Sequence, residues 1–225
     1  MRKILGVCCI LLGICCLIAS LGWIVYNRWE EENAQHATQN ILQDVRKTIL
    51  DNKREEISPD ENIPEETPPK ANDPEIIPEI PPDTPPDIPS DTPREMLTTP
   101  VDGYACIGVL SIPVLELELP VLTDWSYAKL KVAPCHYFGS YYEENFVIAA
   151  HNYRAHFGRL SELQPKDLIL FTDISDTVYC YEVVLLETLP ANATEEMITS
   201  GFDLSLYTCT ASGTSRVTVR CNAVE

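Results

Sequence analysis

The sequence predicts one small domain of mostly β structure, a barrel or a sandwich, at the C-terminal end of a chain that begins with an apolar helix. Three observations lead to this prediction. Residues 4–26 are uncharged and dominated by Leu, Ile, Cys and Val. Thirteen prolines between residues 58 and 100 exclude a packed core there. From residue 103 onward, short β-branched and apolar runs are separated by turn residues, which is typical of a small all-β domain.

Residues 4–26 form the predicted transmembrane helix, because about 20 apolar residues cross a hydrocarbon core as a helix. Arg2 and Lys3 precede the span and Glu30 follows it, and the positive flank normally stays in the cytoplasm. We therefore expect a single-pass signal anchor in the cell membrane, with residues 1–3 cytoplasmic and the bulk of the chain extracellular. A cleaved signal peptide is the alternative, although this apolar run exceeds the roughly 7–15 residues of a signal core.

A polar helical stalk is predicted at residues 27–57, where Ile41, Val45 and Ile49 recur every four residues. We interpret the stripe as one side of a solvated helix, with a weak self-association seam as the alternative. Residues 58–100 are predicted to form an extended linker, which at about 3.1 Å per residue would reach on the order of 130 Å. We therefore expect the domain to stand well away from the membrane.

The charge is concentrated in the same part of the chain. Residues 51–95 hold fourteen acids and four bases, which supplies −10 of the formal net charge of −18. An acidic chain of this kind does not attract phosphate backbones, so nucleic acid is not expected as a partner.

The C-terminal domain, residues 101–225, is predicted to contain seven short strands and only weak helical signals. The expected strands are residues 104–112, 116–122, 146–150, 168–171, 178–187, 204–210 and 215–221. Helical turns are expected near residues 126–131, 157–163 and 194–200.

Five of the nine cysteines fall in this domain, and none forms a Cys-x-x-Cys pair, so a zinc knuckle is not indicated. Because five is an odd number, at least one thiol should be free. Four of the five are interpreted as buried thiols, with a disulfide among them left open: Cys106, Cys135, Cys180 and Cys221.

Three residues at strand ends are candidates for catalysis. Cys209 ends one apolar strand, and Arg216 would lie nearly opposite if the next strand folds back as a hairpin. His151 ends another strand, where a rigid element can hold a base. A thiol needs a neighbouring imidazole or cation to become an effective nucleophile. Arg220 shares a strand face with Arg216 and is the alternative oxyanion group, and a merely buried Cys209 is the alternative to catalysis.

A metal site at the histidines is not favoured. His151 and His156 are five residues apart, the helical spacing of four is absent, and no carboxylate completes a ligand set with them or with His136. We interpret His156 as a residue that packs or caps a loop near the site. No cofactor is predicted, and no pocket of acids for Ca²⁺ is found in the sequence.

The segment from Ser205 to Arg216 resembles the sortase signature, in which Thr or Ser, Leu, any residue, Thr and Cys end one strand and an Arg begins the next. Ile107–Pro113 and Leu119–Leu122 are similar to the opening strands of that family, and Val147–Asn152 is similar to its histidine strand. The resemblance implies a closed β-barrel with short helices. Two departures are Ala150 in place of a common Gly and a Cys-to-Arg spacing of seven.

Carried over by position, the resemblance implies that Cys209 attacks the Thr carbonyl of a secreted protein's C-terminal sorting motif similar to Leu-Pro-x-Thr-Gly and cleaves between Thr and Gly. His151 would act as acid and base, and Arg216 would steady the oxyanion. An amine of a cell-wall precursor such as lipid II would then resolve the thioester, anchoring the protein to a Gram-positive-type wall. The residues implied to lie next to the substrate are Thr208, Ala150 and Asn152.

The class of sortase and three alternative functions remain open as hypotheses. A class A- or D-like sortase is favoured, because residues 181–204 leave no room for a large inserted helix. A pilin-polymerising sortase is disfavoured, since no lid segment and no second apolar span are found in the sequence. A hydrolytic cysteine protease is the enzyme alternative. A membrane-tethered β-barrel binding module with a structural Cys209 is the alternative that is not an enzyme.

Overall fold

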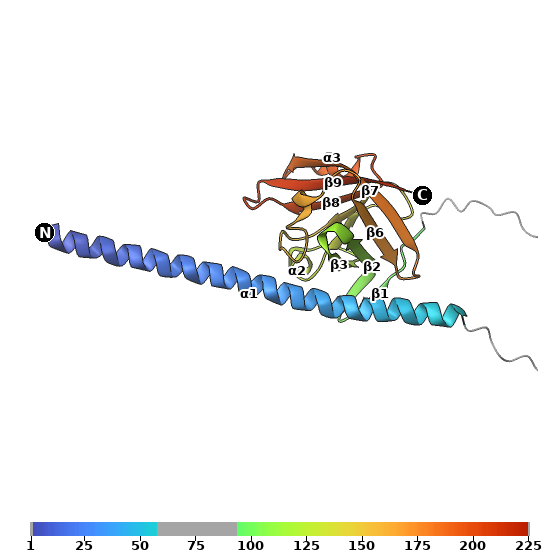
Figure 1. The fold of residues 1–225 in the computed structure, drawn as a ribbon, viewed down its shortest axis with the longest axis horizontal. Helices are drawn as coiled ribbons and strands as arrows, with labels where there is room; N and C mark the ends of the chain where they lie inside the picture. Colours follow the sequence, from blue (N-terminus) through green and yellow to red (C-terminus); the bar gives the residue numbers. More distant parts are fainter. Residues whose placement is uncertain (1, 58–93, 225) are drawn as a thin grey trace, which may run out of the picture.

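The computed structural model describes residues 2–57 and 94–224, with side chains from residue 10 to 54 and from 94 to 224. One long helix, α1 (Arg2–Ile57), runs alongside a β-barrel that the C-terminal part of the chain forms (Figure 1). Most of the predicted linker, residues 58–93, lies outside the described residues.

The N-terminal half of α1 is apolar and unpacked. Every side chain from residue 10 to 29 is exposed. Among the described residues, α1 is the one helix long and apolar enough to cross a membrane. Such a helix is stable in the hydrocarbon core of a membrane, because its side chains are apolar and its backbone hydrogen bonds are made within the helix.

The C-terminal half of α1 is not the solvated stalk that the sequence led us to expect. Ile41, Val45 and Ile49 are 1%, 0% and 5% exposed, because the stripe packs against the barrel. Its buried neighbours on the barrel are Val101, Cys106, Val109, Leu122, Ala133, Cys135 and Ile174. The stripe therefore faces the domain of the same chain rather than solvent or a second copy.

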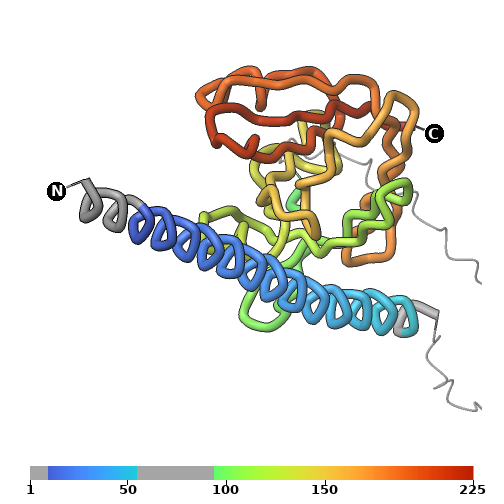
Figure 2. Tube along the Cα trace, turned by 60° about the vertical axis from the view of Figure 1, so that its left-hand side comes forward, coloured from blue at the N-terminus to red at the C-terminus, as the bar shows by residue number. Residues whose placement is uncertain are grey.

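Polar contacts flank this apolar seam. Arg46 pairs with Glu118, and Nδ2 of Asn52 donates to the main-chain oxygen of Ile174 at 3.2 Å. Figures 1 and 2 both show α1 lying along one side of the barrel. Because α1 itself packs on the barrel, the helix and not residues 58–93 sets the distance between the barrel and the apolar half of α1, and the extended form of the linker stays a prediction.

Nine strands form one sheet, and eight of them close into the barrel. They are β1 (Thr99–Val101), β2 (Tyr104–Ile112), β3 (Leu117–Leu122), β4 (Cys135–Phe138), β5 (Phe146–Ala149), β6 (Leu168–Asp173), β7 (Val178–Pro190), β8 (Leu204–Cys209) and β9 (Ser215–Ala223). Their order is β1-β2-β3-β4-β5-β8-β9-β7-β6, and β6 also pairs with β2. This last pairing closes a ring of all strands except β1, so the fold is a closed barrel rather than a sandwich.

The seven expected strands are confirmed, and the sequence missed two. β1 is three residues long and contains a proline, while β4 is four residues long and includes a histidine. Runs this short show no measurable alternation. Helical turns occur where expected, as α2 (Tyr127–Leu130), η2 (Leu160–Glu162) and α3 (Thr194–Ile198), with an additional η1 (Pro113–Leu115).

The barrel closes at a glycine. Gly108 is the residue at which β2 begins to pair with β6. A Cβ atom there would lie 2.2 Å from the main-chain oxygen of Thr172, so only glycine allows the two strands to approach this closely. Inside, the rings of Tyr141, Phe146 and Phe171 pack together with centroids 5.0–5.8 Å apart.

The packed domain begins before the predicted boundary at residue 101. The guanidinium of Arg94 lies 3.9 Å from the ring centroid of Tyr142, and the main-chain N–H of Leu97 donates to the hydroxyl of Tyr141. The chain is therefore fixed on the barrel from Arg94 onward.

Candidate active site

Cys209 and Arg216 face each other across a hairpin. They are Cα partners at the end of the β8–β9 pair that adjoins the connecting turn. Thr210 N–H donates to the oxygen of Ser215, and Gly213 takes the positive φ of 72° that this turn requires. The arrangement predicted from the sequence is confirmed, and it depends on the strand register.

Both side chains line one cleft in the barrel wall. The residues that line it are Trp125, Tyr127, Leu130, Tyr137, Ala149, Ala150, Pro190, Ala191, Ala193, Thr194, Met197, Tyr207, Cys209 and Arg216. Cys209 is exposed there. The Arg216 guanidinium donates only to the main-chain oxygens of Gly213 and Ser215, and within the described residues no carboxylate pairs with it. It therefore keeps donor capacity and positive charge for a ligand.

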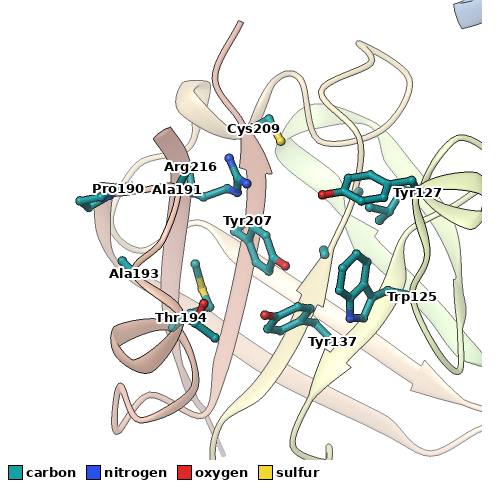
Figure 3. Close-up of a pocket in the computed structure, with 14 residues that line it drawn as sticks. Trp125, Tyr127, Tyr137, Pro190, Ala191, Ala193, Thr194, Tyr207, Cys209 and Arg216 are labelled. Atoms are coloured by element: carbon teal, nitrogen blue, oxygen red, sulfur yellow. The ribbon is translucent and has the colours of Figure 1, made fainter. Parts of the chain in front are cut away.

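Aromatic rings form the other wall of the cleft. Tyr137 lies 5.4 Å from Tyr207 and 5.6 Å from Trp125, and Trp125 contacts Tyr127 at 5.8 Å between centroids. Figure 3 shows these rings around the same cleft as Cys209 and Arg216. Trp125 is 42% and Tyr127 is 80% exposed, so the apolar wall is open to a ligand. Sequence reasoning missed this cluster, because its members come from a loop, a helical turn and two strands.

His151 lies level with Cys209 on the neighbouring chain segment. Ala149 of β5 is the parallel partner of Tyr207, and Ala150 N–H donates to the oxygen of Tyr207. His151 and Cys209 each follow two residues after these partners, where β5 has already ended, and His151 is not among the residues that line the cleft. Within the described residues no hydrogen bond joins the imidazole to the thiol, so this structure brings the two residues level without pairing them.

Two neighbours orient the His151 ring. Its Nδ1 lies 3.0 Å from Oδ1 of Asn152, and its face stacks on Tyr153 at 4.2 Å with only 2° between the planes. Asn152 thus contacts His151 rather than the cleft. The main-chain N–H of Asn152 donates to the same Nδ1 at 3.1 Å, so both polar contacts of the ring are at Nδ1, and Nε2 has no hydrogen-bond partner among the described residues.

The loop after His151 is tightly closed. The N–H groups of His156 and Gly158 both donate to the oxygen of Tyr153, and Phe157 N–H donates to the oxygen of His151. A Cβ on Gly158 would lie 2.5 Å from the oxygen of Asn152, so a side chain does not fit there. The loop that carries the imidazole is therefore a fixed turn.

His156 is fully buried beneath this turn, and acid is expected to destabilise the protein through it. Burial, with a smaller effect of charge on His151, lowers the pKa of His156 from 6.5 to about 4. Between these values the unfolded chain binds a proton that the folded chain does not, so stability falls as the pH falls. The loss reaches about 3 kcal/mol near pH 4 and is absent above pH 6.5.

Urea unfolding at pH 7, 5.5 and 4.5 measures this loss. The His156→Gln variant keeps a donor for Thr38 and cannot titrate, so its stability should decline less over the same range. Equal declines in both proteins would contradict the assignment.

Thr208 and Arg220 have structural positions. Thr208 is buried and its hydroxyl donates to the oxygen of Ala150 at 2.9 Å, so it joins β8 to the chain after β5 and does not line the cleft. Arg220 is 2% exposed and binds Glu187 and Ser205 at 2.8 Å. Arg220 therefore has no free donor facing Cys209, and Arg216 alone of the two lines the cleft.

The remaining cysteines of the domain are free thiols. Cys106, Cys135 and Cys221 are buried and Cys180 is half-buried. Burial raises the pKa of the thiols of Cys106, Cys135 and Cys221 to about 12, so they stay protonated and inert. Cys209 is the exposed thiol of the domain.

Comparison with known proteins identifies a family. The family model for the sortase domain matches residues 110–224, which is just over half of the chain. No curated protein sequence matches the chain.

Solved structures are similar to this chain, and the first of them shares its fold. Sortase A from Corynebacterium diphtheriae has a TM-score of 0.50 and 23% identity, over 54% of this chain and 62% of that one. Sortase C from Clostridium perfringens SM101 has a TM-score of 0.48 and 22% identity, over 53% and 70% of the two chains. Sortase C from Streptococcus pneumoniae has a TM-score of 0.48 and 26% identity, over 53% and 67%. The present chain thus spans less than two thirds of the length of the Corynebacterium protein.

Proposed function

The chain belongs to the sortase family, and from that premise we propose that it is a cysteine transpeptidase that cleaves a Leu-Pro-x-Thr-Gly-like motif between Thr and Gly. The observation that carries this proposal is the placement of an exposed thiol opposite an unpaired guanidinium at the end of an open cleft, with an imidazole level with the thiol. We propose His151 as acid and base and Arg216 as oxyanion donor.

The proposed reaction has two steps, acylation of Cys209 and aminolysis of the thioester. The Cys209 thiolate attacks the Thr carbonyl carbon, and N–H groups of Arg216 bind the oxyanion that forms. The C–N bond to Gly breaks as His151 gives its proton to the leaving amine, and a thioester remains. An incoming amine then loses a proton to His151 and attacks the thioester, so that an amide forms and Cys209 leaves as the thiolate.

The aromatic wall supports a motif that contains proline. A proline ring is compact and apolar, and Pro-containing extended segments pack against exposed aromatic faces. The rings of Trp125, Tyr137 and Tyr207 offer such faces a short way along the cleft from Cys209. Specificity within the motif is therefore proposed to rest on these rings.

Replacing Trp125 by alanine should weaken substrate binding. We expect KM for the peptide to rise about tenfold and kcat to change less than about twofold, because the ring is proposed to contact the proline of the motif and not the reacting carbonyl. Steady-state kinetics measure both constants. Phe138→Ala is the control, since Phe138 is 41% exposed on β4 but does not line the cleft. Equal effects of the two changes would argue against a role of Trp125 in recognition.

The membrane arrangement follows from α1. We propose that its apolar half is a signal anchor with the N-terminus in the cytoplasm and the barrel outside. The helix continues without a break from Tyr26 to Thr38, which touches the barrel, and twelve residues rise about 18 Å. The cleft would then lie near the membrane surface, and a substrate that is itself membrane-bound would need only a short spacer. The amine acceptor proposed is a cell-wall precursor such as lipid II.

One experiment tests the proposed function. The full-length protein in detergent is incubated with a Leu-Pro-x-Thr-Gly peptide library and an amine, and mass spectrometry follows the thiol and the products. An adduct on Cys209 together with the ligated peptide is expected. An adduct followed only by hydrolysis would favour the protease alternative, and no adduct with any peptide would favour a binding module. We keep class A- or D-like as the proposed class, because only the short α3 lies between β7 and β8.

A further inference from the structure

The part of α1 that follows its apolar half contacts the loop of residues 151–158, here called the histidine loop, at Glu31 and Thr38. Oε1 of Glu31 accepts from the main-chain N–H of Arg154 at 2.6 Å. The hydroxyl of Thr38 lies 2.8 Å from Nε2 of His156. Nζ of Lys131 donates to Oε1 of Glu30 at 2.5 Å, which adds a contact between the same turn of α1 and the barrel and lowers the pKa of the Glu30 carboxyl.

The direction of the Thr38–His156 hydrogen bond follows from the remaining partners. The Thr38 hydroxyl has one proton and lies within hydrogen-bond distance of the main-chain oxygens of Ala34 and Val132, which can only accept it. It therefore accepts a hydrogen bond from Nε2–H of His156. Burial keeps this ring neutral, so its Nδ1 carries no proton, and Nδ1 is buried without a partner. The bond to Thr38 is thus the contact that fixes the ring.

A short chain of contacts leads from this ring to His151. The main-chain N–H of His156 donates to the main-chain oxygen of Tyr153, and the ring centroids of His156 and Tyr153 lie 5.5 Å apart. Tyr153 in turn stacks flat on the imidazole of His151. A shift of His156 therefore moves the ring against which the His151 imidazole rests.

We propose that α1 is a positioning element of the active site, in which Thr38 and His156 hold the plane of the His151 ring through Tyr153. This inference rests on the proposed role of His151 as acid and base. It assigns to the helix that leads into the membrane a direct part in arranging the catalytic groups. A misplacement of about 1 Å in such a group costs roughly 10²-fold in rate, so a partial loosening should cost about tenfold.

Three variants of the full-length protein test the proposal. Thr38→Val keeps the shape of the side chain and removes the hydroxyl, whereas Thr38→Ser keeps the hydroxyl. Asn52→Ala is the matched control, because it also removes one hydrogen bond from α1 to the barrel, at Ile174 and away from the histidine loop. We expect Thr38→Val to lower kcat about tenfold with KM changed less than about twofold, and the other two to stay near the parent values.

A second readout does not require activity. The NMR resonances of the His151 ring respond to the ring current of Tyr153, so Thr38→Val should shift them, while Thr38→Ser and Asn52→Ala should not. Unchanged kcat and unchanged resonances in Thr38→Val would overturn the proposal. A parent protein that forms no acyl-enzyme, together with the expected shift in Thr38→Val, would refute the proposed function and leave the positioning contact standing.

Folding is controlled separately. Thermal unfolding should show a larger loss for Thr38→Val than for Asn52→Ala, because the first strands the buried Nε2–H of His156 and the second removes one part-buried hydrogen bond. If Thr38→Val does not fold, Glu31→Ala takes its place, because Glu31 is only half-buried and its carboxylate holds Arg154 N–H of the same loop. The same fall in kcat and shift of His151 are expected there at smaller size, and their absence would equally overturn the proposal.

Discussion

Replacing Cys209 by alanine is expected to abolish both acyl-enzyme and ligated product, with kcat/KM falling on the order of 10⁴-fold or more. The thioester cannot form without the sulfur, and the oxyanion donor and the imidazole cannot replace it. Cys209 is exposed at the end of β8, so the truncation leaves no cavity and stability should change by less than about 0.5 kcal/mol. Mass spectrometry of the peptide reaction and thermal unfolding measure the two quantities.

Cys180→Ala is the matched control for this loss. Cys180 is a half-buried thiol on β7, and it does not line the cleft. Its replacement should leave transpeptidation unchanged. Product formation by Cys209→Ala at more than a hundredth of the parent rate would remove Cys209 from the role of nucleophile.

The part of the site formed by two strands that follow each other in the sequence was predictable. Cys209 and Arg216 are close in the sequence, and a hairpin brings them together as soon as the turn is recognised. His151 was predictable only through the family resemblance. Its place beside the strand of Cys209 depends on the parallel pairing of β5 with β8, which are distant in the sequence. Sequence periodicity carries no information on which strands become neighbours.

The aromatic wall and the packing of α1 could not be predicted for the same reason. Trp125 and Tyr207 are far apart in the sequence, and they line one cleft because β4, β5 and β8 lie side by side in the sheet. The stripe of Ile41, Val45 and Ile49 correctly indicated a helix with one apolar side, but not which surface covers it. The composition of residues 58–100 predicts a spacer, whereas α1 before this segment and Arg94 within it both contact the same barrel.

The two arginines of β9 provide the second large effect. Arg216→Ala is expected to lower kcat about 10²- to 10³-fold with little change in stability, because a donor to the developing oxyanion is lost and the side chain makes no ion pair among the described residues. Arg216→Lys should recover only part of the rate, since an ammonium lacks the planar pair of donors. Steady-state kinetics with the peptide and an amine measure these losses.

Arg220 is the internal comparison, because the same residue type four positions away should fail in a different way. Its buried guanidinium donates to Glu187, to Ser205 and to the main-chain oxygen of Glu196 on α3. Arg220→Met should therefore cost on the order of 2 kcal/mol of stability, because these partners lose their donor. The fraction that stays folded should keep its kcat. If instead Arg220→Met folds normally and loses kcat, while Arg216→Ala keeps it, the oxyanion donor is Arg220. The two substitutions thus separate a charge that meets the substrate from a charge that holds the barrel together.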